Sequence, residues 1–131
     1  MPLKILLADD HHVMRQALKV LLEQRGFAVV GEAADGLEAV RQANEKHPDV
    51  AVLDLSMPLL NGLDAGQQIK EMMPSVKLVY LTMNHDADLA AEAFRRGASG
   101  YLLKTCAASE LAIAVREVLR GCGSRTRTWT N

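Results

Sequence analysis

Five short apolar runs, separated by segments with helical periodicity, constrain the fold of this 131-residue chain more than any other feature. The runs cover residues 3–8, 28–33, 50–53, 77–81 and 100–103. Residues 5–8 and 50–53 are apolar without polar alternation, which is typical of strands covered on both faces of a parallel sheet. We therefore expect five buried parallel strands.

Between these runs, apolar residues recur every three or four positions, which predicts helices with one buried stripe each. The stripes are Val13, Ala17, Leu18, Leu21 and Leu22; Leu37, Val40 and Ala43; Leu63, Gly66, Ile69 and Met73; Leu89, Ala90, Ala93 and Phe94; and Leu111, Val115, Val118 and Leu119. Such alternation requires right-handed crossovers and helices on both faces of the sheet. The prediction is an α/β chain with a (βα)5 doubly wound, flavodoxin-like fold and strand order 2-1-3-4-5.

Composition limits the range of functions. With 49% apolar and 24% charged residues, the chain fits a single domain. Its net charge of −1 gives no overall attraction to nucleic acid or to acidic lipid. There is no secretory leader and no apolar run near the roughly 18 residues that a membrane span needs, so we expect a cytoplasmic chain with no membrane partner. Cys106 and Cys122 lack C-x-x-C spacing and are interpreted as packing residues or bystanders.

Three carboxylates are expected at one edge of the sheet. Asp9 and Asp10 follow the first strand and Asp54 follows the third, and these strands are neighbours at the point where the winding reverses and ligands bind. Two such charges about 4 Å apart would repel by about 4 kcal/mol at an intermediate dielectric. A divalent cation relieves this repulsion, and clustered oxygen ligands suit Mg²⁺ or Mn²⁺. No Cys or His pair has zinc spacing.

Two further polar residues are expected at the same edge. Thr82 ends the fourth run and Lys104 directly follows the fifth. A metal held by acids, a hydroxyl donor and a lysine can together hold a dianionic phosphoryl group. Asp54, on the central strand, is the best placed nucleophile, with Asp9 and Asp10 holding the metal beside it. The predicted product is an aspartyl phosphate.

This constellation resembles the receiver domain of bacterial response regulators over about residues 3–120. The motifs that carry the resemblance are Asp9-Asp10, Asp54-Leu55-Ser56-Met57-Pro58, Asn61-Gly62, Thr82 and Lys104. Residues 81–83 and 97–104 further resemble the NarL/FixJ subfamily of two-component systems, whose members usually carry a LuxR-type helix-turn-helix domain. The expected function is therefore that of a signalling phosphoacceptor, and not of an enzyme with turnover.

The resemblance implies how the phosphoryl group is accepted. Asp54 would take it from a sensor histidine kinase. Asp10, Asp54 and the backbone carbonyl of Ser56 would bind Mg²⁺ directly, and Asp9 would do so through water. Lys104 would pair with a phosphoryl oxygen.

The resemblance also implies a conformational switch. The Thr82 hydroxyl would move toward the phosphoryl group, and the ring of Tyr101 would turn into the space it leaves. This movement would change the surface formed by the fourth helix, the fifth strand and the fifth helix, and so control homodimerisation and an output domain. In the full-length protein that output is expected to be transcription regulation.

The expected domain organisation is a receiver over residues 1–120 and a linker or tail over residues 121–131. The usual DNA-binding domain is absent from this chain, so DNA would be reached only through that missing part. Thr105 follows Lys104 where many receivers have proline, and a trans bond is expected there because a non-proline cis bond costs about 2.5 to 4 kcal/mol.

Other interpretations remain open. His11, His12 and His85 flank the predicted cleft, and we interpret them as loop residues because no H-E-x-x-H spacing is present. A phosphatase of the haloacid dehalogenase type would also form an aspartyl phosphate, although Asp9-Asp10-His11 breaks its D-x-D spacing. A receiver-like module that binds partners whether or not Asp54 is modified is a third possibility.

Overall fold

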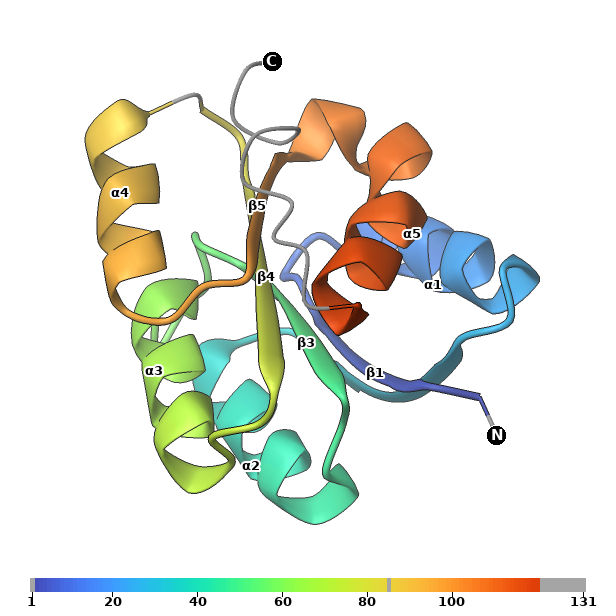
Figure 1. The fold of residues 1–131 in the computed structure, drawn as a ribbon, viewed down its shortest axis with the longest axis horizontal. Helices are drawn as coiled ribbons and strands as arrows, with labels where there is room; N and C mark the ends of the chain where they lie inside the picture. The colour runs from blue at the N-terminus through green and yellow to red at the C-terminus, as the bar shows by residue number, and fades with distance from the viewer. Residues whose placement is uncertain (1, 85, 121–131) are drawn as a thin grey trace.

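The computed structural model describes residues 2–84 and 86–120, in which strands and helices alternate (Figure 1). The strands are β1 (Lys4–Ala8), β2 (Ala28–Ala33), β3 (Val50–Asp54), β4 (Lys77–Thr82) and β5 (Gly100–Leu103). The helices are α1 (His12–Gln24), α2 (Gly36–Lys46), α3 (Gly62–Met72), α4 (Ala87–Arg95) and α5 (Lys104–Leu119). The predicted alternation is confirmed. Residues 121–131, including Cys122 in the predicted tail, lie outside the described residues, as does His85.

The strands form one parallel sheet in the order β2-β1-β3-β4-β5, as predicted. Ala8 of β1 pairs with Leu53 of β3, so the residues that follow them, Asp9 and Asp54, come level at the carboxyl edge. Helices α1 and α5 cover one face of the sheet, and α2, α3 and α4 cover the other (Figure 1). The strand order therefore brings two predicted acidic residues together.

Two apolar layers hold the helices against the sheet. Ile5 and Leu7 pack toward α1 and α5, whereas Leu6 and Ala8, between and after them, pack toward α2, α3 and α4. Strand β3 is buried along its whole length, which explains why its sequence shows no polar alternation. Since each fully buried aliphatic side chain contributes about 1.5 to 3 kcal/mol, this double layer supplies most of the driving force for folding.

The predicted helix stripes are wrong at three positions. Val13 is 81% exposed, and Leu37 and Ala17 are also exposed. Val13 and Leu37 lie in the first turns of α1 and α2, which begin at the carboxyl edge of the sheet and extend beyond the strands that could cover them. The predicted Leu18 and Leu22 of helix α1 are buried, and the predicted Leu21 packs beside them together with Met14. Ala17 lies outside this stripe.

The helices that cover the two faces of the sheet differ in whether a side chain caps their first turn. Asp35, Asn61 and Asp86 each accept a backbone N–H in the first turn of α2, α3 and α4, respectively, as helix N-caps commonly do. Helices α1 and α5 have no side-chain cap. Helix α5 begins at Lys104 immediately after β5 ends, and this direct junction places the lysine at the sheet edge.

Three further expectations concern the peptide bond after Lys104, the side chain of Cys106 and the absence of a membrane span. Every peptide bond there is trans, including the one between Lys104 and Thr105. Cys106 is a free, half-buried thiol packed against the core. Across residues 2–84 and 86–120, none of the helices combines the length and the apolar character that crossing a membrane requires.

Gly62 lets α3 start against the backbone of β3. Its N–H donates to the carbonyl of Leu55 at 3.0 Å. A Cβ added at Gly62 would overlap the carbonyl oxygen of Asp54, which belongs to the main chain and has no flexible end that could move aside. Gly62 therefore sets how closely α3 approaches the end of β3.

We predict that Gly62→Ala lowers the free energy of unfolding by about 1 to 3 kcal/mol because the added methyl group overpacks this junction. Urea unfolding followed by circular dichroism measures the loss. Gly31→Ala is the matched control, since a methyl group there meets the movable end of the Gln42 side chain. Equal losses in the two variants would contradict the proposed close approach.

Candidate functional site

The carboxyl edge of the sheet gathers charged side chains from three elements of the chain. Asp9 and Asp10 follow β1, Asp54 ends β3, and Lys104 begins α5. The side chains of Lys104, Asp9 and Asp54 are only 2%, 0% and 1% exposed, whereas Asp10 is partly exposed. Buried charges need partners, and these residues supply them to one another.

Lys104 lies at the centre of this group. Its ammonium donates to Oδ1 of Asp9 at 2.9 Å and to Oδ2 of Asp54 at 2.9 Å, and it lies 2.8 Å from Nδ1 of His11. An ammonium has three donors and no acceptor, so all three N–H groups have partners. Burial alone would lower the pKa of Lys104, but the hydrogen bonds and charges of Asp54 and Asp9 outweigh it and raise that pKa. The lysine is therefore a buried cation.

The Asp54 carboxyl group is poorly solvated. Burial raises its pKa to about 6, although the hydrogen bonds from Lys104 and from the Ser56 N–H act in the opposite direction. The Ser56 N–H donates to Oδ1 of Asp54 at 3.1 Å. The nearby charge of Asp9 raises the pKa of Asp54 further. One ammonium thus does not fully compensate two buried carboxylates, and the group retains an excess of negative charge.

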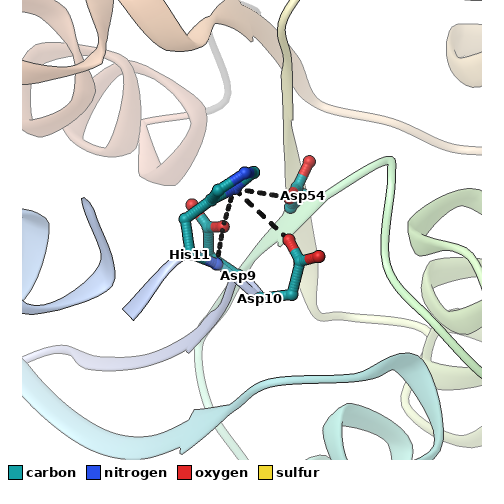
Figure 2. A group of neighbouring side chains, drawn as sticks. All are labelled: Asp9, Asp10, His11 and Asp54. Carbon is teal, nitrogen blue, oxygen red and sulfur yellow. Dashed lines mark hydrogen bonds and ion pairs between the residues drawn. The ribbon is translucent and has the colours of Figure 1, made fainter. Parts of the chain in front are cut away.

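This acidic group has the composition of a site for a hard divalent cation. Asp9, Asp10, His11 and Asp54 each offer one ligand atom, and these atoms lie within 4.8 Å of one another (Figure 2). Oδ2 of Asp9 is buried and has no hydrogen-bond partner among residues 2–84 and 86–120, which is costly unless a ligand satisfies it. Carboxylate oxygens are the ligands that Mg²⁺ and Mn²⁺ take in proteins. The residues present therefore fit such a cation.

An open cavity of about 400 Å³ lies beside Asp54. Ser56, Thr82 and Asn84 contribute to its lining. The Thr82 hydroxyl donates to the Asn84 carbonyl and accepts from the Asn84 N–H, both at 3.3 Å. The cavity leaves room for a small group next to Asp54, with a hydroxyl on its wall.

Thr82 is also linked to Tyr101 on the neighbouring strand. Burial raises the pKa of Tyr101, and a hydrogen bond with Thr82 opposes that increase. The tyrosine is 2% exposed and its ring packs against Phe94 of α4, with ring centroids 6.5 Å apart. The ring is therefore already buried in this structure, against the helix that the predicted switch would move.

Two residues that contribute to the site, His11 and Arg15, are not predicted by the sequence motifs. His11, interpreted above as a flanking loop residue, extends its Nδ1 into the acidic group (Figure 2). Its neighbour His12 instead contacts Arg15 at 3.2 Å. Arg15 donates to the carbonyl of Asp9 at 2.7 Å and so holds the turn after β1. The only sequence signal for His11 is that it directly follows Asp10.

Comparison with known proteins gives a consistent result. The family described as the response regulator receiver domain matches residues 5–116. The chain is 42% identical over 121 residues to the oxygen regulatory protein NreC of Staphylococcus haemolyticus, covering 91% of this chain and 56% of that protein. It therefore spans little more than half the length of this relative.

Solved structures agree with this similarity. A two-component response regulator of the LuxR family from Aurantimonas has a TM-score of 0.88 at 37% identity, covering 94% of this chain and 89% of that one. The signal receiver domain of the putative response regulator NarL from Mycobacterium tuberculosis has a TM-score of 0.86 at 27% identity, covering 92% and 98%. The resemblance stated from the motifs is confirmed.

We predict that Lys104→Met destabilises the protein by about 3 to 5 kcal/mol, because it leaves two buried carboxylates without their cation. Urea unfolding in a chelating buffer measures the effect. Lys19→Met is the matched control, since Lys19 pairs with Glu32 near the surface at 3.1 Å and such pairs contribute little. A loss no larger than that of the control would show that Lys104 does not neutralise the site.

Proposed function

Because this chain belongs to the response regulator receiver domain family, we propose that Asp54 accepts a phosphoryl group from a sensor histidine kinase in a Mg²⁺-dependent reaction. The observation that carries this proposal is the position of Asp54. Its carboxylate is buried beside the Lys104 ammonium, lines an open cavity and belongs to the acidic group at the sheet edge. We place this exchange in the cytoplasm.

The proposed reaction is a direct transfer. A carboxylate oxygen of Asp54 forms a bond to phosphorus while the bond between phosphorus and the donor breaks, and the leaving group takes the electron pair. Lys104, held at the sheet edge by α5, would then pair with a phosphoryl oxygen. Asp54 loses its own negative charge in the acyl phosphate, a mixed anhydride, and the phosphoryl group brings new charge to the same edge.

The residues proposed to hold Mg²⁺ are Asp10, Asp54 and the backbone carbonyl of Ser56, with Asp9 acting through water. When bound, the ion would neutralise charge on the phosphoryl oxygens. Asp9 and Asp54 are already held by hydrogen bonds from Lys104. Asp9 also accepts a hydrogen bond from the backbone N–H of His11 at 2.9 Å. These contacts hold both carboxylates in place before the ion arrives. Mn²⁺ is an alternative ion.

We predict that incubation with Mg²⁺ and acetyl phosphate adds one phosphoryl mass to the wild-type chain and none to Asp54→Asn. Mass spectrometry of the intact protein measures this, and a chelating buffer should prevent the addition. Equal labelling of Asp54→Asn would contradict the assignment. Sustained release of phosphate from a small phosphomonoester would instead identify a phosphatase.

The proposed output is a shift of the α4-β5-α5 surface. Modification of Asp54 would draw the Thr82 hydroxyl toward the phosphoryl group and away from Asn84 and Tyr101. Met83 and Asn84, which follow β4, and the Tyr101 ring would then favour a second arrangement. We further propose that this surface mediates homodimerisation and controls the output domain of a longer regulator that acts on transcription through DNA.

We predict that beryllofluoride with Mg²⁺ shifts the ¹⁹F resonance of Tyr101 in protein labelled with fluorotyrosine. The chain has two tyrosines, so Tyr80→Phe assigns the signal. The same shift should be absent in Asp54→Asn, and light scattering of the wild-type sample should show an increase in mass. An unchanged Tyr101 signal and an unchanged mass would favour a module whose interactions do not depend on Asp54.

A further inference from the structure

His11 introduces a nitrogen atom into a site otherwise made of oxygen atoms. Its Nδ1 lies 3.1 Å from Oδ1 of Asp9, 3.3 Å from Oδ1 of Asp10 and 3.9 Å from Oδ2 of Asp54 (Figure 2). Three carboxylates from two strand ends thus surround a single imidazole nitrogen. The phosphoacceptor chemistry proposed above uses the backbone N–H of this residue but not its imidazole ring.

These spacings match those of ligands that share one ion. In an octahedral site with ligand bonds of about 2.1 Å, adjacent ligands lie about 3 Å apart and opposite ligands about 4.2 Å apart. The distance from Nδ1 to Asp10 falls near the first value, and the distance to Asp54 approaches the second. Asp9, proposed above to act through water, is not counted among these direct ligands. The other oxygen of Asp9, Oδ2, is buried and has no partner among residues 2–84 and 86–120, so this carboxylate can still accept from a water or another ligand.

The imidazole presents an available lone pair to this group. Lys104 Nζ lies 2.8 Å from Nδ1, and an ammonium can only donate. In the tautomer with its proton on Nε2, Nδ1 accepts this contact and carries a lone pair. An unprotonated nitrogen is the form that binds a metal ion. If Lys104 releases Nδ1 to an entering ion, it keeps its bonds to Asp9 and Asp54.

We propose that Nδ1 of His11 is a ligand of the divalent cation at this site and shifts its preference from Mg²⁺ toward Mn²⁺ and Co²⁺. The proposal rests on the proposed function, because it concerns the cation that this function requires. Imidazole nitrogen binds first-row transition ions better than it binds Mg²⁺, which prefers oxygen and keeps its waters. A nitrogen ligand therefore strengthens the binding of Mn²⁺ and Co²⁺ selectively.

His12 provides a matched control within the same turn. It adjoins His11 and is exposed, but its Nδ1 contacts the guanidinium of Arg15 instead of the acidic group. His12→Ala therefore removes an imidazole from the same segment without removing a proposed ligand. Asp10→Asn serves a different purpose, since it tests whether an added ion binds at this site at all.

Calorimetric titration of the whole chain with MnCl₂, CoCl₂ and MgCl₂ tests the proposal. His11→Ala should lose about tenfold or more in affinity for Mn²⁺ and Co²⁺, since even outer partners of metal ligands contribute that much. Its affinity for Mg²⁺ should change less, so the ratio of Mn²⁺ to Mg²⁺ affinity falls. His12→Ala should keep the wild-type ratio, and Asp10→Asn should weaken the binding of all three ions.

Pulsed electron paramagnetic resonance of bound Mn²⁺ provides a direct readout. Coupling to a ligand nitrogen should be present in the wild type and in His12→Ala, and absent in His11→Ala. An unchanged affinity ratio in His11→Ala would overturn the proposal, as would nitrogen coupling that persists in that variant. Mn²⁺ binding that Asp10→Asn leaves intact would place the ion elsewhere and would also overturn it.

The acetyl phosphate experiment on the wild-type chain separates this inference from the proposed function. Labelling of Asp54 together with an unchanged affinity ratio in His11→Ala rejects the role of His11 alone. Mn²⁺ binding that depends on His11, in a chain that cannot be labelled, rejects the phosphoacceptor function and leaves the nitrogen ligand standing.

Discussion

The contact of one buried ammonium with two buried carboxylates is the constraint on which the site depends. Lys104, Asp9 and Asp54 come from α5, the end of β1 and the end of β3, and almost no solvent reaches them. Buried charges are tolerated only when they are paired and hydrogen-bonded. The elements that carry these residues must therefore come together closely, and the apolar layers on both faces of the sheet keep them there.

The same arrangement leaves the site unsaturated. One ammonium offsets only part of the charge of two buried carboxylates and the nearby Asp10, and burial raises the pKa of Asp54. One oxygen of Asp9 has no partner in the part of the chain that the structure describes. A second cation and a phosphoryl group would each complete interactions that the folded chain leaves incomplete. The site is thus rigid enough to position its carboxylates and still reactive, because its own charges do not balance.

Features that follow from local sequence patterns could be predicted, whereas features that depend on tertiary packing could not. The strands, their order and the position of Asp54 could be predicted because uninterrupted apolar runs and the winding rule act locally and generally. The exposure of Val13 and Leu37 could not, because it depends on how far a helix extends beyond the sheet. The contacts of His11 and Arg15 depend on the direction of side chains in one turn, on which periodicity carries no information.

The sequence by itself determined the (βα)5 alternation, the acidic residues at the strand ends, and the motifs shared with response regulator receivers. Only the tertiary structure decided that Lys104 bonds both Asp9 and Asp54, that the ring of Tyr101 is buried beside α4, and that His11 rather than His12 faces the acidic group. The reason is that element type follows from short-range patterns, whereas the partners of a side chain follow from strand register and from the one turn conformation that the packed layers allow.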